Sequence, residues 1–267
     1  MDPRATLRIP VRREPDGLSA LDDVAVEEPL EIRIGSEPLA VLMRTPGRDL
    51  DLAAGFLLAE GIIDGPDDLV ALGPCADPSR PNAHNIVIVS LASGCAPRVA
   101  RVARSFAATS SCGVCGKATI DSILQHVRPH EAFATIPAAL VRDAARRVEA
   151  GQEGFRRTGG LHAAALFEGA GELTAVAEDV GRHNAVDKVC GAALRGGRVP
   201  LDGATLWVSG RASFEVVQKA AMAGAAAVVC VGAPSSLAVS LAGECRLTLV
   251  GFARGKRFNV YTGAVTP

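Results

Sequence analysis

The sequence predicts an α/β protein in which a layered sheet with helices follows a smaller N-terminal α+β part. The first observation is a set of apolar runs of strand length in the second half of the chain, several of them separated by helical patterns. These runs are Leu161–Phe167, Leu173–Ala177, Thr205–Val208, Ala225–Val231 and Leu247–Phe252. The second observation is a hydrophobic content of 48% in 267 residues, which is ample for a core. We expect a flexible leader at 1–20, an α+β part at 21–136 and an α/β domain at 137–267.

In the N-terminal part, residues 30–34 alternate between apolar and charged side chains, which is typical of a half-buried strand. The segment 45–49 contains Pro46 and Gly47 and breaks this pattern. An apolar helical stripe follows, with acidic residues at its start. We therefore expect a strand and then a helix in this part.

Two further helices are predicted in the middle of the chain. The apolar spacing from Ile120 to Val127 predicts one, and Pro129 ends it. The other runs from about Pro137 to Gln152, with one apolar face made by Leu140, Val141, Ala144 and Val148. We expect the segment 151–160 to be a loop.

Charge and hydropathy exclude several classes of protein. The chain has 28 Lys+Arg and 29 Asp+Glu, so its net charge of -1 gives no support for a general nucleic-acid or anionic-membrane binder. Residues 1–17 lack the apolar stretch of a secretory signal, and the longest apolar run, 220–233, is too short to span a bilayer. We therefore expect a soluble cytoplasmic protein.

One close cysteine pair, Cys112 and Cys115, lies in the small-residue segment 110–117 before a predicted helix. A thiol near a helix N-terminus or a lysine ionises more readily to the nucleophilic thiolate, so we expect reactive sulfur here. Two other interpretations stay open from the residues alone. One is a redox dithiol, and the other is a zinc site, because His126 and His130 complete the pattern C-x2-C-x10-H-x3-H.

Polar loops follow three of the predicted strands, at 178–184, 209–213 and 232–236. We expect Ser213 to cap a helix that begins at Phe214. Because ligands of open α/β sheets bind beyond the carboxyl ends of strands, these loops predict one pocket. Their cationic, amide and acidic groups suit a phosphorylated, nucleotide-like ligand. These groups are Asp179, Arg182, His183, Asn184, Asp187, Lys188 and Arg211.

These features occur together with a set of longer motifs, and the chain resembles the formate dehydrogenase accessory sulfurtransferase family, FdhD. The matching segments cover nearly the whole chain apart from the leader. They are 28–30, 42–47, 55–63, 111–116, 158–164, 178–188, 209–211, 233–236 and 251–255.

The resemblance implies a sulfur carrier with a cytidine deaminase-like fold. It implies that sulfane sulfur passes from a cysteine desulfurase to Cys112 as a persulfide, with Cys115 as its helper, and then to the molybdenum bis-guanine-dinucleotide cofactor of formate dehydrogenase. The family's cofactor-binding stretch corresponds to Phe252, Ala253, Arg254, Gly255, Lys256 and Arg257. To these we add Gly181, Arg182, His183, Asn184, Lys188, Ser209, Gly210 and Arg211 from the polar loops.

The resemblance also implies that the cofactor is a bound substrate, that guanine nucleotides mimic it and that the carrier itself holds no metal. The expected partners are the desulfurase, the catalytic subunit of formate dehydrogenase and a second copy in a homodimer. The alternative is a cofactor-binding chaperone without sulfur chemistry, in which the cysteine pair is structural. Deaminase chemistry is excluded because His162-Ala163-Ala164 lacks the glutamate of the H-x-E signature. His162 itself is either a core histidine or a ligand contact.

Overall fold

The structure is a computed structural model that describes residues 2–77, 79–100, 102, 127 and 129–267. The strands of the first half are β1 (Thr6–Arg13), β2 (Leu18–Ala25), β3 (Glu28–Ile34), β4 (Glu37–Arg44), β5 (Leu69–Pro74) and β6 (Ile86–Leu91). Those of the second half are β7 (Thr135–Pro137), β8 (His162–Glu168), β9 (Glu172–Asp179), β10 (Thr205–Val208), β11 (Ala227–Cys230), β12 (Thr248–Arg254), β13 (Arg257–Thr262) and β14 (Ala264–Thr266). The α-helices are α1 (Asp49–Ala59), α4 (Ala138–Glu149), α5 (Glu153–Thr158), α6 (Arg182–Arg195), α7 (Phe214–Met222) and α8 (Ser236–Glu244). Short 3-10 turns lie at Pro3–Ala5, Pro66–Asp68, Ala83–Asn85 and Ser93–Cys95.

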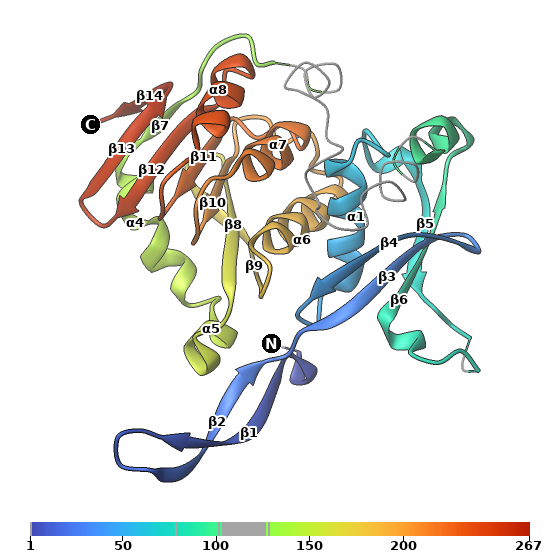
Figure 1. Ribbon diagram of the computed structural model, residues 1–267. Helices are drawn as coiled ribbons and strands as arrows, with labels where there is room; N and C mark the ends of the chain where they lie inside the picture. Colours follow the sequence, from blue (N-terminus) through green and yellow to red (C-terminus); the bar gives the residue numbers. More distant parts are fainter. Residues whose placement is uncertain (1, 78, 101, 103–126, 128) are drawn as a thin grey trace.

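The second half of the chain is built on a six-stranded sheet in the order β13-β12-β11-β10-β8-β9 (Figure 1). Strands β10, β11 and β12 are parallel, whereas β8 is antiparallel to both β10 and β9. Alternate residues of β8 divide between two cores, because successive side chains of a strand point to opposite faces. Ala164 and Leu166 pack with α1, α6 and α7, whereas Ala163, Ala165 and Phe167 pack with α4. The predicted layered α/β domain is thus formed, with a helix layer on each face.

The N-terminal part forms a four-stranded sheet in the order β4-β3-β6-β5, with α1 packed against it. The strand and the helix expected in this part are confirmed as β3 and α1. However, α1 is not amphipathic: every residue from Asp51 to Ala59 is buried. This all-round burial arises because α1 lies between its own sheet and α6, as Figure 1 shows. The two parts of the chain therefore share one hydrophobic core.

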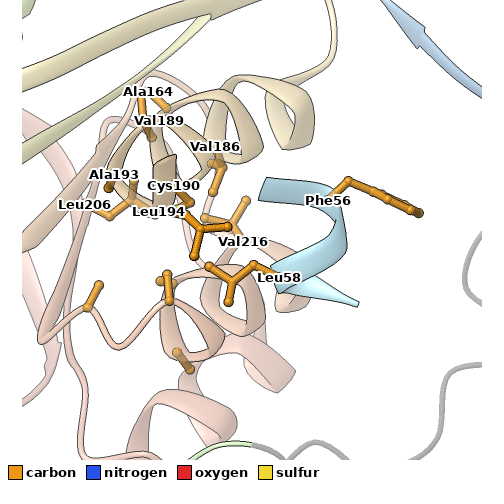
Figure 2. Close-up of a cluster of buried hydrophobic side chains, with 14 of the residues drawn as sticks. Phe56, Leu58, Ala164, Val186, Val189, Cys190, Ala193, Leu194, Leu206 and Val216 are labelled. Atoms are coloured by element: carbon orange, nitrogen blue, oxygen red, sulfur yellow. The ribbon is translucent and has the colours of Figure 1, made fainter. Parts of the chain in front are cut away.

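Two glycines set the distance between α1 and α6. A methyl group at Gly191 of α6 would lie 1.8 Å from the carbonyl oxygen of Asp51, and one at Gly55 of α1 would lie 1.9 Å from that of Asp187. Both distances are far inside van der Waals contact. The helix backbones can approach this closely only because neither position carries a side chain. Leu58, Leu194 and Val216 then close the cluster around the contact (Figure 2).

Two segments differ from the sequence-based expectation. Instead of a flexible leader, the first residues form a β1–β2 hairpin that projects from the body of the molecule (Figure 1). The pairing of β1 with β2 stabilises this hairpin, and so do the contacts of Asp23 with Arg8 and Arg157. The amino-acid composition of the leader indicates neither. The segment 151–160, expected to be a loop, contains the short helix α5, whose first N–H groups donate to Glu178. No helix in the described part of the chain is long and apolar enough to cross a membrane.

We predict that Gly191→Ala lowers the free energy of unfolding by about 1–3 kcal/mol or more, because the added methyl group must push α1 away from α6. Urea denaturation measures this change. The matched control is Gly243→Ala in α8, where a methyl group meets nothing within 4 Å and helix propensity favours alanine by up to about 1 kcal/mol. Equal effects of the two substitutions would contradict the close-contact explanation.

Candidate functional site

The polar loops predicted to line one pocket do meet at one edge of the six-stranded sheet. The carboxyl ends of β9, β10, β11 and β12 all point to this edge, and β8 begins there. Backbone hydrogen bonds join the loops: Gly232 N donates to the Gly210 oxygen at 2.9 Å, and Phe252 N donates to the Gly232 oxygen at 2.9 Å. Ser235 N likewise donates to the Ala212 oxygen at 3.0 Å. We call this set of loops, with the start of β8, the carboxyl edge.

Asp179, the last residue of β9, fixes the first turn of this edge. The carboxylate is completely buried and accepts four hydrogen bonds. Its donors are Thr45 N at 3.1 Å, Gly181 N at 2.8 Å, Asn184 Nδ2 at 3.0 Å and Lys188 Nζ at 2.7 Å. Because Thr45 belongs to the N-terminal part, the same carboxylate also ties that part to the start of α6.

Two residues expected to contact a ligand are fully occupied within this network. Lys188 is buried, and its ammonium group donates to Asp179, to the Thr45 oxygen at 2.9 Å and to the Glu178 oxygen at 3.2 Å. Burial lowers the pKa of Lys188, while the neighbouring Asp179 opposes that shift. The amide of Asn184 donates to Asp179 and to the Met43 oxygen at 2.7 Å. Both side chains therefore position the turn and have no donor left for a ligand.

The helices that begin at the carboxyl edge differ in how they are capped. No side chain caps α6 or α7, whereas Ser235 caps α8 by accepting from Ala238 N at 3.2 Å. The predicted start of α7 at Phe214 is confirmed, but the predicted cap by Ser213 is wrong. The Ser213 hydroxyl instead lies 3.1 Å from His183 Nε2, which also contacts Glu215 Oε2 at 3.0 Å. The first N–H groups of α6 and α7 thus lack the side-chain acceptor that a cap supplies.

Arg182, His162 and Gly210 converge beside this turn. A methyl group at Gly210 would lie 3.5 Å from His162 Nδ1 and 3.7 Å from Arg182 Cδ. Partial burial lowers the pKa of His162, and so do the neighbouring side chains of Arg182 and His183. This shift favours the neutral form of the imidazole near pH 7. Its place opposite Asp179 in the β8–β9 register puts it on the edge, and the sequence signal for this was its position at the start of an apolar run.

The basic turn between β12 and β13 forms the other end of the carboxyl edge. Phe252 is exposed and has a positive φ of 53°, which is uncommon for a residue other than glycine. Arg254 donates from Nε to the Val231 oxygen at 3.3 Å, and Lys256 and Arg257 are exposed. Ala253 differs, because its side chain is buried against the α4 face of the sheet. Only the backbone of Ala253 is therefore left to contact a ligand.

Ser209, Gly210 and Arg211 follow β10 in the middle of the edge. The Ser209 hydroxyl accepts from Ala163 N at 2.9 Å, which ties the loop to β8. Arg211 is exposed, and a methyl group at Gly232 would lie 3.1 Å from its Cγ. The loops after β10 and β11 therefore pack on each other and present Arg211 between the two ends of the edge.

The predicted sulfur site lies outside the described residues. Cys112 and Cys115 belong to the segment 103–126, and so does His126 of the zinc hypothesis. His130, the other histidine of that hypothesis, has its Nε2 atom 3.0 Å from the Ala225 oxygen. The described ranges contain no group of three His, Cys, Asp or Glu side chains placed to hold a metal ion.

Sequence reasoning missed two cavities, of about 340 and 410 Å³. The smaller one reaches the first turn of the carboxyl edge, where Leu161, Glu178 and Lys188 also line it. Both are lined by Asp2, Gly47 and Arg48, where the N-terminal residues meet the loop before α1. The guanidinium of Arg48 is already bound there, to Asp51 and to the Val176 oxygen. The residues that line these cavities come from segments that are distant in sequence, so no local motif predicts them.

Comparison with known proteins identifies the family of this chain. The model of the FdhD/NarQ family matches residues 25–266. This chain belongs to the FdhD/NarQ family. Sulfur carrier protein FdhD of Mycobacterium tuberculosis is 49% identical over 250 residues, which cover 91% of each chain. Sulfur carrier protein FdhD of Streptomyces coelicolor is 49% identical over 268 residues, covering 98% of this chain and 95% of the relative.

A solved structure has the same fold. The crystal structure of a protein from Desulfotalea psychrophila, described as a formate dehydrogenase accessory protein, superposes with a TM-score of 0.74. The match covers 97% of this chain and 96% of that chain at 24% sequence identity. The arrangement of sheets and helices in this FdhD/NarQ family member is thus also found in an experimental structure.

For this FdhD/NarQ family member we predict that Lys188→Met costs about 3–5 kcal/mol of folding free energy, because it leaves the Asp179 carboxylate buried beside two carbonyl oxygens without their cation. The double variant Lys188→Met/Asp179→Asn should lose less than the sum of the single losses, since it removes both charges. Urea denaturation of all four proteins gives the coupling energy. Arg142→Met, an exposed change on α4, is the control, and strictly additive losses would show that the pair is not coupled.

We further predict that His162 titrates below its usual pKa of 6.5 and that Arg182→Met raises this pKa by removing a nearby positive charge. Since the pKa of His162 is lower in the folded chain than in the unfolded one, its contribution to stability is present above pH 6.5 and decreases as the pH falls through the folded pKa. Titration of the histidine ring resonances by NMR measures both shifts. A pKa at or above 6.5 in the wild type would refute the assigned environment.

Proposed function

We propose that this chain is a sulfur carrier that takes sulfane sulfur from a cysteine desulfurase as a persulfide on Cys112. It then delivers that sulfur to the molybdenum bis-guanine-dinucleotide cofactor required by formate dehydrogenase. The observation that carries this proposal is the 49% identity, over more than nine-tenths of the chain, to relatives named sulfur carrier protein FdhD. The Desulfotalea psychrophila protein described as a formate dehydrogenase accessory protein supports it through its fold.

The first chemical step needs a thiolate. The Cys112 sulfur attacks the terminal sulfur of a persulfide on the desulfurase, the S–S bond of the donor breaks, and the donor cysteine leaves as a thiolate. The new S–S bond on Cys112 stores the sulfur until a nucleophilic acceptor attacks the outer sulfur, whereupon that S–S bond breaks and Cys112 leaves as the thiolate. Cys115 assists in this scheme. Three buried cysteines of the described residues are less suited to it, because burial raises the pKa of Cys190 to about 12 and those of Cys230 and Cys245 to about 11.

The carboxyl edge is the proposed binding surface for the cofactor, which enters as a substrate. The uncapped starts of α6 and α7 suit phosphate oxygens, and so do Arg182, His183 and Arg211 beside them. The Phe252 ring and the basic side chains of the β12–β13 turn extend the same edge. Gly181, Ser209 and Gly210 contribute mainly backbone groups, whereas Asn184 and Lys188 act by positioning the first turn. Binding here would hold the cofactor for transfer by proximity.

The remaining parts of the proposal concern assembly. We place the protein in the cytoplasm, as a homodimer that meets the desulfurase and the catalytic subunit of formate dehydrogenase in turn. The competing function is a cofactor-binding chaperone in which the cysteine pair has only a structural role. The two functions differ in one testable respect, which is whether the Cys112 thiol is needed.

We predict that Cys112→Ala abolishes activation of formate dehydrogenase in cells that lack the endogenous carrier. Incubation with a cysteine desulfurase and cysteine should add the mass of one sulfur atom to the wild type and not to Cys112→Ala, by intact-protein mass spectrometry. Cys75→Ala is the matched control, because Cys75 is a described free cysteine that is not buried. Full activation by Cys112→Ala would establish the chaperone function instead.

A further inference from the structure

The β1–β2 hairpin is a two-stranded sheet that stands away from the body of the molecule (Figure 1). Helix α5 packs against β2, where Arg157 pairs with Asp23 at 3.2 Å. A hairpin of two strands is marginally stable in water unless one of its faces packs against something else. Nearly all of this hairpin precedes residue 25, where the match to the family begins. The family match therefore carries no information on the role of the hairpin.

The register of the hairpin puts its apolar side chains on one face. Residues directly opposite each other in an antiparallel pair point to the same side of the sheet, and successive residues point to opposite sides. One face therefore consists of the pairs Leu7–Val24, Ile9–Asp22, Val11–Ala20 and Arg13–Leu18, and we call it the apolar face. None of these side chains is buried, and Leu7 and Leu18 are more than half exposed. An apolar surface of this kind is typical of a contact with another molecule.

The charged side chains of the two hairpin faces differ in their partners. On the opposite face, Arg8 pairs with Asp23 at 3.0 Å. On the apolar face, neither Arg13 nor Asp22 forms an ion pair with the described residues, although both are exposed. The apolar face thus carries one positive and one negative charge that the described part of the chain leaves unpaired.

The placement of these two charges makes the apolar face self-complementary. Arg13 lies two residues from one side of the central pair Val11–Ala20, and Asp22 lies two residues from its other side. When a second hairpin is laid antiparallel on the first with the central pairs stacked, each Arg13 reaches the level of the other copy's Asp22. The apolar side chains stack between these charges. A contact that uses the same patch on both copies is the isologous geometry of two-fold dimers.

We propose that the apolar face of the β1–β2 hairpin binds the same face of a second copy of this chain, with Arg13 of each copy paired to Asp22 of the other. This inference rests on the homodimer of the proposed function and deepens it, because it assigns the contact surface. Pairing through the strand edges is less suited to the hairpin. Pro10 has no N–H to offer a further strand along β1, and α5 lies against β2.

The size of the apolar face determines how tight this contact can be. Strands β1 and β2 have 8 residues each. The face therefore spans roughly 27 Å by 10 Å. This area is smaller than the roughly 800 Å² that each partner buries in a standard interface. We therefore expect a reversible dimer, whose average mass rises with protein concentration.

The test is sedimentation equilibrium of the full chain over a range of concentrations, which gives the dissociation constant of the dimer. Leu18→Asp places a charge in the apolar face and should raise this constant about 10- to 100-fold. Leu21→Asp is the matched control, since Leu18 and Leu21 are 63% and 61% exposed on the same strand but point to opposite faces. The control should dimerise as the wild type does.

The charged pair allows a second, sharper test. Arg13→Asp and Asp22→Arg should each raise the dissociation constant about 3- to 30-fold, because each variant brings like charges to the same level of the dimer. An equimolar mixture of the two variants should recover most of the lost affinity, since both charged contacts of the mixed dimer join opposite charges. A mixture that dimerises no better than its components would contradict the pairing of Arg13 with Asp22.

The remaining outcomes separate the hairpin contact from the proposed function. If Leu18→Asp and both charge variants dimerise as the wild type does, or if Leu21→Asp weakens the dimer as much as Leu18→Asp, the hairpin contact is overturned while the homodimer stands. A wild type that stays monomeric overturns both. The sulfur mass added at Cys112 is measured separately and tests sulfur transfer alone. If Leu18→Asp unfolds the hairpin, the mixture decides, because its recovery requires two folded hairpins.

Discussion

The close contact of α1 with α6 is the constraint on which the rest of the structure depends. Because Gly55 and Gly191 bring the two backbones together, Asp51 and Asp187 lie beside the crossing with their carboxylates committed to basic side chains. Lys219 donates to both oxygens of Asp187 at 2.8 Å, and Arg48 donates to Asp51 at 2.9 Å. Buried ion pairs contribute little net stability, since desolvation offsets the Coulomb attraction. Here they act on position instead: Lys219 of α7 holds Asp187 of α6, and Arg195 of α6 donates to Asp51 of α1 at 2.5 Å. A slip of α6 along its neighbours would separate these partners.

The position of α6 in turn determines the carboxyl edge. Lys188, one residue from the crossing point, holds Asp179, and Asp179 holds the backbone of the turn that leads into α6. Through Thr45 the same carboxylate connects this turn to the N-terminal part of the chain. Contacts from both the N-terminal part and the α/β domain therefore fix the start of α6, where Arg182 and His183 lie.

Periodicity was enough to predict most of the α/β domain, because β8 to β12 are apolar runs of strand length and α4 and α6 have clear buried faces. It did not predict the β1–β2 hairpin, whose strands are largely exposed, or α5, whose start depends on Glu178 from a distant strand. The candidate site was likewise predictable only in part. Parallel strands bring polar loops to one edge whatever the loops contain, so the meeting of 178–184 with 209–213 was predictable. Whether a polar side chain there faces a ligand depends on its partners, and Lys188, Asn184 and Ser213 have partners from segments remote in sequence.

The buried and half-buried cations of the described residues differ in whether the chain itself supplies their partners. Arg44, Lys188 and Lys219 are buried deeply, and each meets carboxylates or carbonyl oxygens of its own chain. Arg182 is less buried, yet its Nε finds no partner in the part of the chain that the structure describes. A sequence selected for stability alone would place an acidic residue beside it, as it does beside the other three. The carboxyl edge thus keeps a positive charge at some cost in stability, and that cost is understandable if an anionic ligand occupies this place during the working cycle of the protein.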